Sequence, residues 1–191
     1  MSNMTKRSLL AALVLGFFAL HSSPLQAAAT LTEDQVIAQL AGPDEDKVAK
    51  AMLDLEKQFP TSTKAFPAIK KLLIDPREKV RRKAGRVLGA LHAEVDQTDL
   101  KNICAMFKPA NPQETMDALK SLRGLKAGST LPEILPLLQD AHLGILRDAL
   151  RTVAALGNKS HVAAIEPLLK HADMKVQKDA QDAIFALKGK S

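Results

Sequence analysis

Apolar residues recur along the chain with the period of an amphipathic helix. Ile69, Leu72 and Leu73 are spaced i, i+3, i+4, and a second apolar stripe runs through residues 80–91. Residues three and four positions apart share one face of an α-helix. The short polar turn Asp75-Pro76 separates the two stripes, as expected for an antiparallel helix pair. The pattern therefore predicts two packed helices over residues 65–92.

The same pattern recurs at a spacing of 31 to 34 residues, with a looser copy near the start. A small residue marks the same position of the second helix in four copies: Ala84, Ala118, Ala149 and Ala180. One helix pair cannot bury both of its apolar faces, so neighbouring pairs must stack to close a core. The sequence predicts an all-α fold over residues 30–191, a right-handed α-solenoid of about five helix pairs. The repeats are expected at about residues 31–59, 65–92, 98–126, 131–158 and 161–189.

The copy that starts at Leu72 reads Leu-Leu-Ile-Asp-Pro-Arg-Glu-Lys-Val-Arg-Arg-Lys-Ala, and continues to Val-Leu-Gly-Ala-Leu at residues 87–91. It resembles a HEAT repeat of the short bacterial type, which includes the HEAT-like repeats of phycobilisome lyases. The resemblance covers nearly the whole chain after the first 30 residues. It implies a HEAT-like solenoid and a scaffold that binds other proteins.

The resemblance also implies a polar ladder between repeats, built by the Asp of the turn and the Arg that follows the Val. Asp75 and Arg81 match those two places. Leu146 and Gln177 stand at the Arg place in later copies, so an unbroken ladder is not expected.

Residues 1–29 have the order of a secretory signal peptide. Lys6 and Arg7 precede an apolar run from Leu9 to Leu20, and small residues follow at Ala27 and Ala29. The apolar run has 12 residues, whereas a spanning helix needs about 20. We therefore expect an exported protein, periplasmic or secreted, cleaved after Ala27 or Ala29; an uncleaved membrane anchor is the alternative. No later stretch is long and apolar enough to predict a membrane span in the mature chain.

Charge and aromatic content argue against nucleic acid as a partner. The net charge of +6 falls to +4 once Lys6 and Arg7 are removed, which is mildly basic. The chain has no Trp and no Tyr, and four of its six Phe residues lie outside the signal peptide. Sites that stack sugars or single-stranded nucleic acids need aromatic faces. Neither type of site is expected.

Cys104 is the only cysteine, which excludes an internal disulfide. A lone cysteine is most often a small buried apolar residue. Pairing with another molecule is the alternative in an oxidising compartment.

The sequence contains no motif that predicts an enzyme or a cofactor. Gly-x-Ser-x-Gly and the phosphate-binding Gly-x-x-x-x-Gly-Lys-Ser/Thr are absent. The His-Glu dipeptides of the di-iron hydroxylase with HEAT repeats are absent too. A bilin lyase role would follow from the family name alone, and a signal peptide contradicts the intracellular setting of those enzymes.

One candidate metal cluster stays open. At the 31-residue offset His171 is in register with Asp140, and Asp173 with His142. Stacked turns could bring the four side chains together as Zn²⁺ ligands, in a small metal-binding or lyase-like enzyme. The alternative is a hydrogen-bonded polar ladder between exposed turns.

The second helices of a HEAT solenoid line its concave face, which is the usual partner site in that family. Their exposed positions in the three middle repeats are basic: Arg82, Arg86, Lys120, Arg147 and Arg151. Like charges at i, i+4 cost a helix a few tenths of a kcal/mol, which suggests that they are kept for a function. We predict that these five residues bind an acidic surface, that of a protein partner or of an anionic envelope component; a solvated basic face is the alternative. Reversing Arg82 and Arg151 to Glu is expected to abolish binding without lowering the melting temperature.

The first repeat has the opposite charge. Residues 31–59 hold seven acidic and three basic residues, whereas residues 67–86 hold eight basic and two acidic residues. The two segments are expected to attract each other, either between neighbouring repeats or in weak head-to-tail self-association of two copies.

Overall fold

The computed structural model describes residues 31–190, and the predicted signal peptide lies outside them. The described residues form ten α-helices and five short 3-10 helices, with no strand. The α-helices are α1 (Glu33–Gln39), α2 (Glu45–Gln58), α3 (Phe66–Lys71), α4 (Glu78–Ala90), α5 (Gln97–Cys104), α6 (Pro112–Gly124), α7 (Leu131–Ile134), α8 (Leu143–Leu156), α9 (Val162–Ile165) and α10 (Met174–Lys188). The all-α fold class is confirmed. None of the helices in this part of the chain is long and apolar enough to cross a bilayer.

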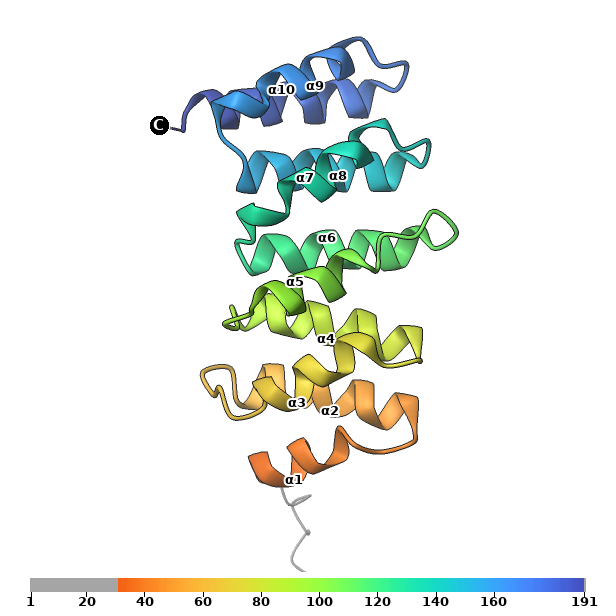
Figure 1. Cartoon of the computed structure of the whole chain (residues 1–191), viewed down its shortest axis with the longest axis vertical. Coiled ribbons are helices and arrows are strands. Elements are labelled where there is room, and N and C mark those ends of the chain that lie inside the picture. The colour runs from red at the N-terminus through yellow and green to blue at the C-terminus, as the bar shows by residue number, and fades with distance from the viewer. Residues whose placement is uncertain (1–30, 191) are drawn as a thin grey trace, which may run out of the picture. The chain divides into compact units, whose positions relative to one another are not determined.

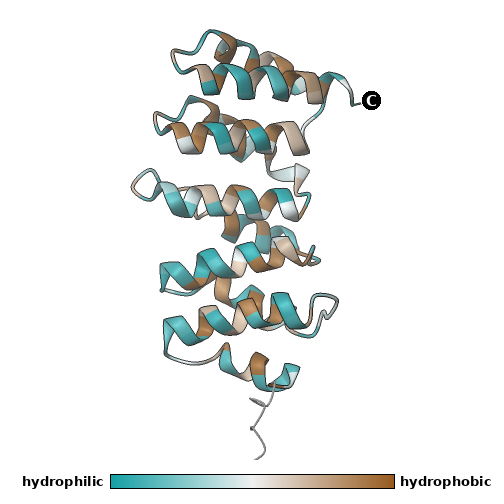
Figure 2. Cartoon of the chain, turned by 180° about the vertical axis from the view of Figure 1, so that it is seen from behind, coloured by the Kyte–Doolittle hydropathy of each residue, from teal (hydrophilic) through white to brown (hydrophobic). Residues whose placement is uncertain are grey.

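The helices of residues 31–190 form five pairs stacked in two layers. The first helices α1, α3, α5, α7 and α9 face the viewer in Figure 1, and the second helices lie side by side in the opposite view of Figure 2. Each second helix packs against the next, in the order α2, α4, α6, α8, α10. The alanine that marks the repeats faces this core, because Ala84, Ala118, Ala149 and Ala180 are at most 1% exposed.

The first helices are shorter than the periodicity predicts, and proline explains where they change. In the fourth repeat α7 gives way at Leu135–Gln139 to a 3-10 helix that contains Pro136. In the last repeat α9 gives way at Glu166–Lys170 to another that contains Pro167. Proline has no N–H to donate and its ring clashes with the preceding turn, so an α-helix cannot run through it undisturbed.

Polar side chains fix where the second helices begin. Asp44, Asn111, His142 and Asp173 are the N-cap residues of α2, α6, α8 and α10, and each accepts a hydrogen bond from a backbone N–H of the first turn. Such a cap stabilises a helix by about 1 kcal/mol. The N-cap residue of α4, Arg77, makes no such hydrogen bond, so the caps fix the first turns of the other four second helices.

Helices α4 and α6 approach backbone to backbone. A Cβ atom added at Gly124 would lie 2.4 Å from the carbonyl oxygen of Gly89, and one at Gly89 would lie 2.8 Å from that of Ser121. Glycine inside a helix costs about 1 kcal/mol relative to alanine. Gly89 is nevertheless in the interior of α4, because no larger residue fits the contact.

We expect Gly124→Ala to lower the free energy of unfolding by about 1–3 kcal/mol, the usual cost of overpacking a closed interface. Alanine is the better helix former, so a loss would report the contact with Gly89 rather than helix propensity. Urea denaturation measures it. Gly128→Ala is the control, since a Cβ there would be 3.6 Å from its nearest neighbour, an ordinary contact distance. Equal stability of the two variants would contradict the close approach.

Candidate functional site

The five predicted basic residues lie on one face, formed by the middle three second helices. Arg82 and Arg86 belong to α4, Lys120 to α6, and Arg147 and Arg151 to α8. Arg86 is exposed. The side chains of Lys120 and Arg151 are 45% and 49% exposed, whereas those of Arg82 and Arg147 are only 27% and 29% exposed. The residues thus differ in how far they can reach a partner.

Four of these cations contact a set of aspartates that the sequence reasoning missed. We call Asp117, Asp148 and Asp179 the aspartate ladder; they recur at the 31-residue spacing. Arg82 reaches Asp117 of the next repeat at 2.8 Å, and Arg147 reaches Asp179 of the next repeat at 2.7 Å.

The other two cations complete the ladder. Arg151 lies 3.1 Å from Asp148 and 3.3 Å from Asp179. Lys120 lies between two rungs, 3.7 Å from Asp117 and 3.9 Å from Asp148. Arg86 forms no ion pair with any of the described residues, so it is the exception among the five.

The aspartates of the ladder are poorly hydrated, which makes their partners important. Asp117 is 4% exposed and Asp148 is 5% exposed. A buried carboxylate is costly unless it is paired and hydrogen-bonded. The hydrogen bond that Arg147 donates to the Asp179 carboxylate raises the pKa of Arg147, with burial acting in the opposite direction. The sequence did contain a signal, because each ladder aspartate directly precedes a marker alanine.

The ladder gives the like-charged pairs another explanation. Arg82 and Arg86 repel each other on α4, but Arg82 is held by Asp117 and also by Glu78 at 3.2 Å. The expectation that Arg82 could be reversed without loss of stability no longer follows, since the reversal would leave Asp117 facing another carboxylate. Partner binding by the five residues stays a prediction.

We expect Arg82→Gln to lower the free energy of unfolding by about 1–3 kcal/mol, because it leaves a buried carboxylate short of its cation. The partial exposure of Arg82 keeps the figure below that of a fully buried pair. Arg86→Gln, one turn along the same helix, is the matched control and should change stability by less than about 0.5 kcal/mol. Chemical denaturation of both variants makes the comparison, and equal effects would contradict the ladder.

The polar ladder that the HEAT resemblance implies takes a different form here. Arg81 donates hydrogen bonds to the carbonyls of Asp75 and Pro76 in its own turn, at 2.7 and 2.8 Å. It also donates to the Glu114 carboxylate of the next repeat, at 2.9 and 3.0 Å. The carboxylate of Asp75 binds Arg77 instead.

Later copies satisfy the turn carbonyl in other ways or not at all. Gln177, at the same place as Arg81, donates to the carbonyl of His171 at 2.6 Å. Leu146, at that place in the fourth repeat, is 2% exposed and has no polar side-chain atom. The polar ladder that the HEAT resemblance implies is interrupted there, as the sequence predicts.

The four candidate metal ligands act as local caps and do not gather into one site. Asp140 accepts a hydrogen bond from the backbone N–H of His142, and His171 accepts one from that of Asp173. The side chains of His142 and Asp173 cap α8 and α10. Among residues 31–190, no group of three or more His, Cys, Asp or Glu side chains is placed to hold a metal ion. The open candidate for a metal site is not assembled in this part of the chain, because the turn geometry directs each side chain to its own backbone.

Cys104 is partly buried at the end of α5, where it packs against the hydrophobic core. Burial raises the pKa of its thiol to about 11, and the negative charge of Glu133 contributes. Since the thiolate is the reactive form, the thiol is poorly reactive at neutral pH. The environment fits the expectation of a small apolar residue.

The acidic residues of the first repeat contact the second repeat. Lys79 of α4 forms an ion pair with Asp46 of α2, and Lys64, in the loop just before the second repeat, forms one with Asp34 of α1. Attraction between neighbouring repeats is therefore present within one chain. Head-to-tail association of two copies stays a prediction.

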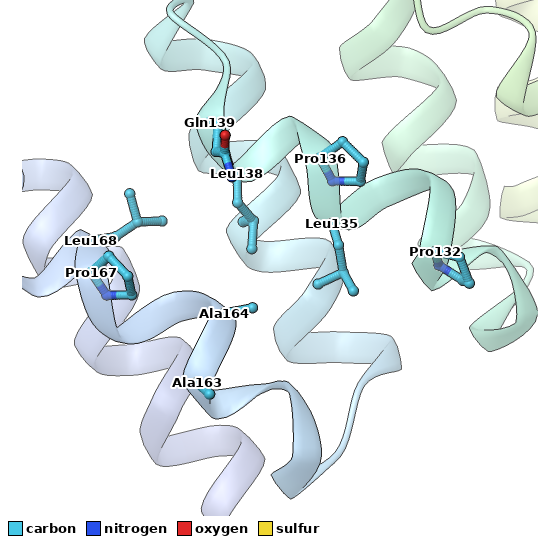
Figure 3. A pocket seen from close by; sticks show the side chains of 9 residues that line it. All are labelled: Pro132, Leu135, Pro136, Leu138, Gln139, Ala163, Ala164, Pro167 and Leu168. Atoms are coloured by element: carbon cyan, nitrogen blue, oxygen red, sulfur yellow. The ribbon is translucent and has the colours of Figure 1, made fainter.

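A groove of about 680 Å³ opens on the first-helix side between the last two repeats. Figure 3 shows Pro132, Leu135 and Pro136 on one side of it and Ala163, Ala164 and Pro167 on the other. Gln139 is its only polar lining side chain. The groove therefore offers no acid, base or nucleophile for catalysis.

Comparisons with known proteins support the fold alone. No protein-family model and no curated protein matches the sequence. The chain is similar to a solved structure of the complex of CpcE and CpcF of phycocyanin lyase from Nostoc sp. PCC7120. The TM-score is 0.70 at 22% identity, over 89% of this chain and 70% of that one.

An engineered protein is similar at a TM-score of 0.64 and 19% identity, over 81% of this chain and 80% of that chain. A second engineered protein gives 0.62 and 16%, over 81% and 78% of the two chains. These likenesses support the HEAT-like interpretation of the repeats as a statement about fold.

Proposed function

We propose that the protein is an exported, non-enzymatic scaffold that binds a protein with an acidic surface through the face formed by its second helices. One observation carries the proposal: five second helices lie side by side and expose cations along the middle of that face. Arg86 is exposed, and the side chains of Lys120 and Arg151 are 45% and 49% exposed. An extended surface of this kind suits a protein partner better than a small substrate, which prefers an enclosed cleft.

The aspartate ladder adds to the case for a scaffold. Its aspartates form ion pairs with Arg82 and Arg147, so these two residues hold neighbouring repeats together and are less available to a partner. The more exposed cations Arg86, Lys120 and Arg151 remain accessible to a partner on the same face. Rim charges of this type chiefly set the rate and the specificity of association.

Binding can be tested with a variant that leaves the close ladder contacts of Arg82 and Arg147 in place. We expect Arg86→Gln with Lys120→Gln to reduce capture of partners from a periplasmic extract at low salt, because it removes exposed positive charge. The captured protein is then purified and its affinity for wild type and variant measured by calorimetry. We expect a weakening of about tenfold, and stronger binding at low salt.

Lys175→Gln with Lys178→Gln is the matched control, since these exposed residues of α10 form no ion pair in residues 31–190. Unchanged melting temperatures show that the variants fold. A purified partner that binds the wild type and the Arg86/Lys120 variant equally would exclude this face.

Export is a separate part of the proposal and rests on the order of residues 1–29. Expression of the full chain in a bacterium should give a periplasmic protein whose mass corresponds to cleavage after Ala27 or Ala29. Intact-mass spectrometry of the fractionated protein measures this. An uncleaved chain in the membrane fraction would instead identify an anchor.

A further inference from the structure

We propose that acidic side chains of the protein partner enter the groove over α2 and α4, where Lys83 and Arg86 pair with them. This inference rests on the proposed function, and it assigns the binding of the acidic partner to one groove of the second-helix face. Both residues lie on α4 and line the same groove, which has a volume of about 480 Å³.

The register of the repeats shows why this groove differs from the rest of the face. Asp117, Asp148 and Asp179 each precede a marker alanine and pair with cations of the repeat before. At the same place before Ala84 the chain has Lys83. The carboxylate that would neutralise this part of the face is replaced by a positive charge.

The other charges of the groove are already paired. Lys50 binds Asp54 at 2.5 Å, Arg82 binds Asp117 at 2.8 Å, and Lys79 forms an ion pair with Asp46. Five basic and two acidic side chains line the groove. Lys83 and Arg86 form no ion pair with any residue from 31 to 190, so the excess positive charge belongs to them.

The surroundings of Lys83 favour an incoming anion. Burial is the main cause that lowers the pKa of Lys83; the charges of Glu56 and Asp117 raise it, and those of Arg86 and Lys57 lower it further. A half-buried cation without a partner gains from a carboxylate that supplies the missing charge. Ala49 and Leu53 of α2 add an apolar, half-buried wall beside it.

The spacing of the two cations indicates what they would recognise. Residues three apart on a helix have Cβ atoms about 5–6 Å from each other. Arg86 can hold a carboxylate by two parallel hydrogen bonds, and Lys83 offers a point charge. Two neighbouring carboxylates of one protein segment, with an apolar residue against Leu53, match this arrangement.

The test uses residues 30–191 of the wild type and a fluorescein-labelled peptide of six glutamates, with fluorescence anisotropy at low salt. Lys83→Gln with Arg86→Gln is expected to weaken binding about tenfold, which corresponds to about 1.4 kcal/mol. Lys175→Gln with Lys178→Gln removes the same charge at the same spacing from α10. This control should stay within about twofold of the wild type. Melting temperatures of both variants establish that they fold.

The outcomes separate this inference from the proposed function. Equal weakening in both variants would overturn the groove and leave an acidic partner for the face as a whole. An absence of peptide binding by the wild type, together with partner binding that is insensitive to salt, would overturn the acidic partner itself. Tighter binding to phosphatidylglycerol vesicles than to the peptide, lost in the Lys83/Arg86 variant, would assign the groove to a lipid surface.

Discussion

Each second helix in this solenoid must bury its apolar face against the next second helix. The chain has no disulfide, and each first helix is short or divided by proline, so most long-range packing falls to α2, α4, α6, α8 and α10. Repeat proteins depend on such contacts between neighbours, because no repeat holds a closed core alone. The packing also determines where polar groups can lie. An aspartate just before the buried alanine is carried into the seam between two repeats, and a cation must follow it there.

The same seam explains why the basic face is less free than its composition suggests. Arg82 and Arg147 are committed to Asp117 and Asp179, so a count of surface cations overstates the charge available to a partner. Electrostatic attraction at a surface is screened by salt, whereas ion pairs at a partly dry seam are screened much less. Basic residues thus serve both purposes in this protein: the more buried ones stabilise the contact between repeats, and the more exposed ones are available for recognition. In the second repeat Lys83 stands in place of that aspartate, and the cations there that form no ion pair within residues 31–190 are free for recognition.

The sequence predicted the all-α solenoid, its repeats and the burial of the marker alanines, because these depend on periodicity. It also placed the five cations on one face. It could not predict the pairing of Arg82 with Asp117, since that contact joins residues 35 apart across a seam whose helix rotation is unknown beforehand. The four candidate metal ligands do not come together in the described residues, for a related reason. The repeat register brings equivalent turns near each other. The directions of the His142 and Asp173 side chains are nevertheless set by the hydrogen bonds with which they cap their own helices.

The close approach of α4 and α6 has a consequence for the modularity of the chain. Gly89 in the second repeat and Gly124 in the third fit each other, and the carbonyl of Gly89 fills the space that a side chain at Gly124 would need. The later second helices have Ala154 and Phe185 at the place of Gly89, and neither of their seams has a glycine pair of this kind. The second and third repeats therefore fit each other specifically. A copy of either repeat, inserted elsewhere in the stack, would pack against a neighbour that lacks the matching glycine.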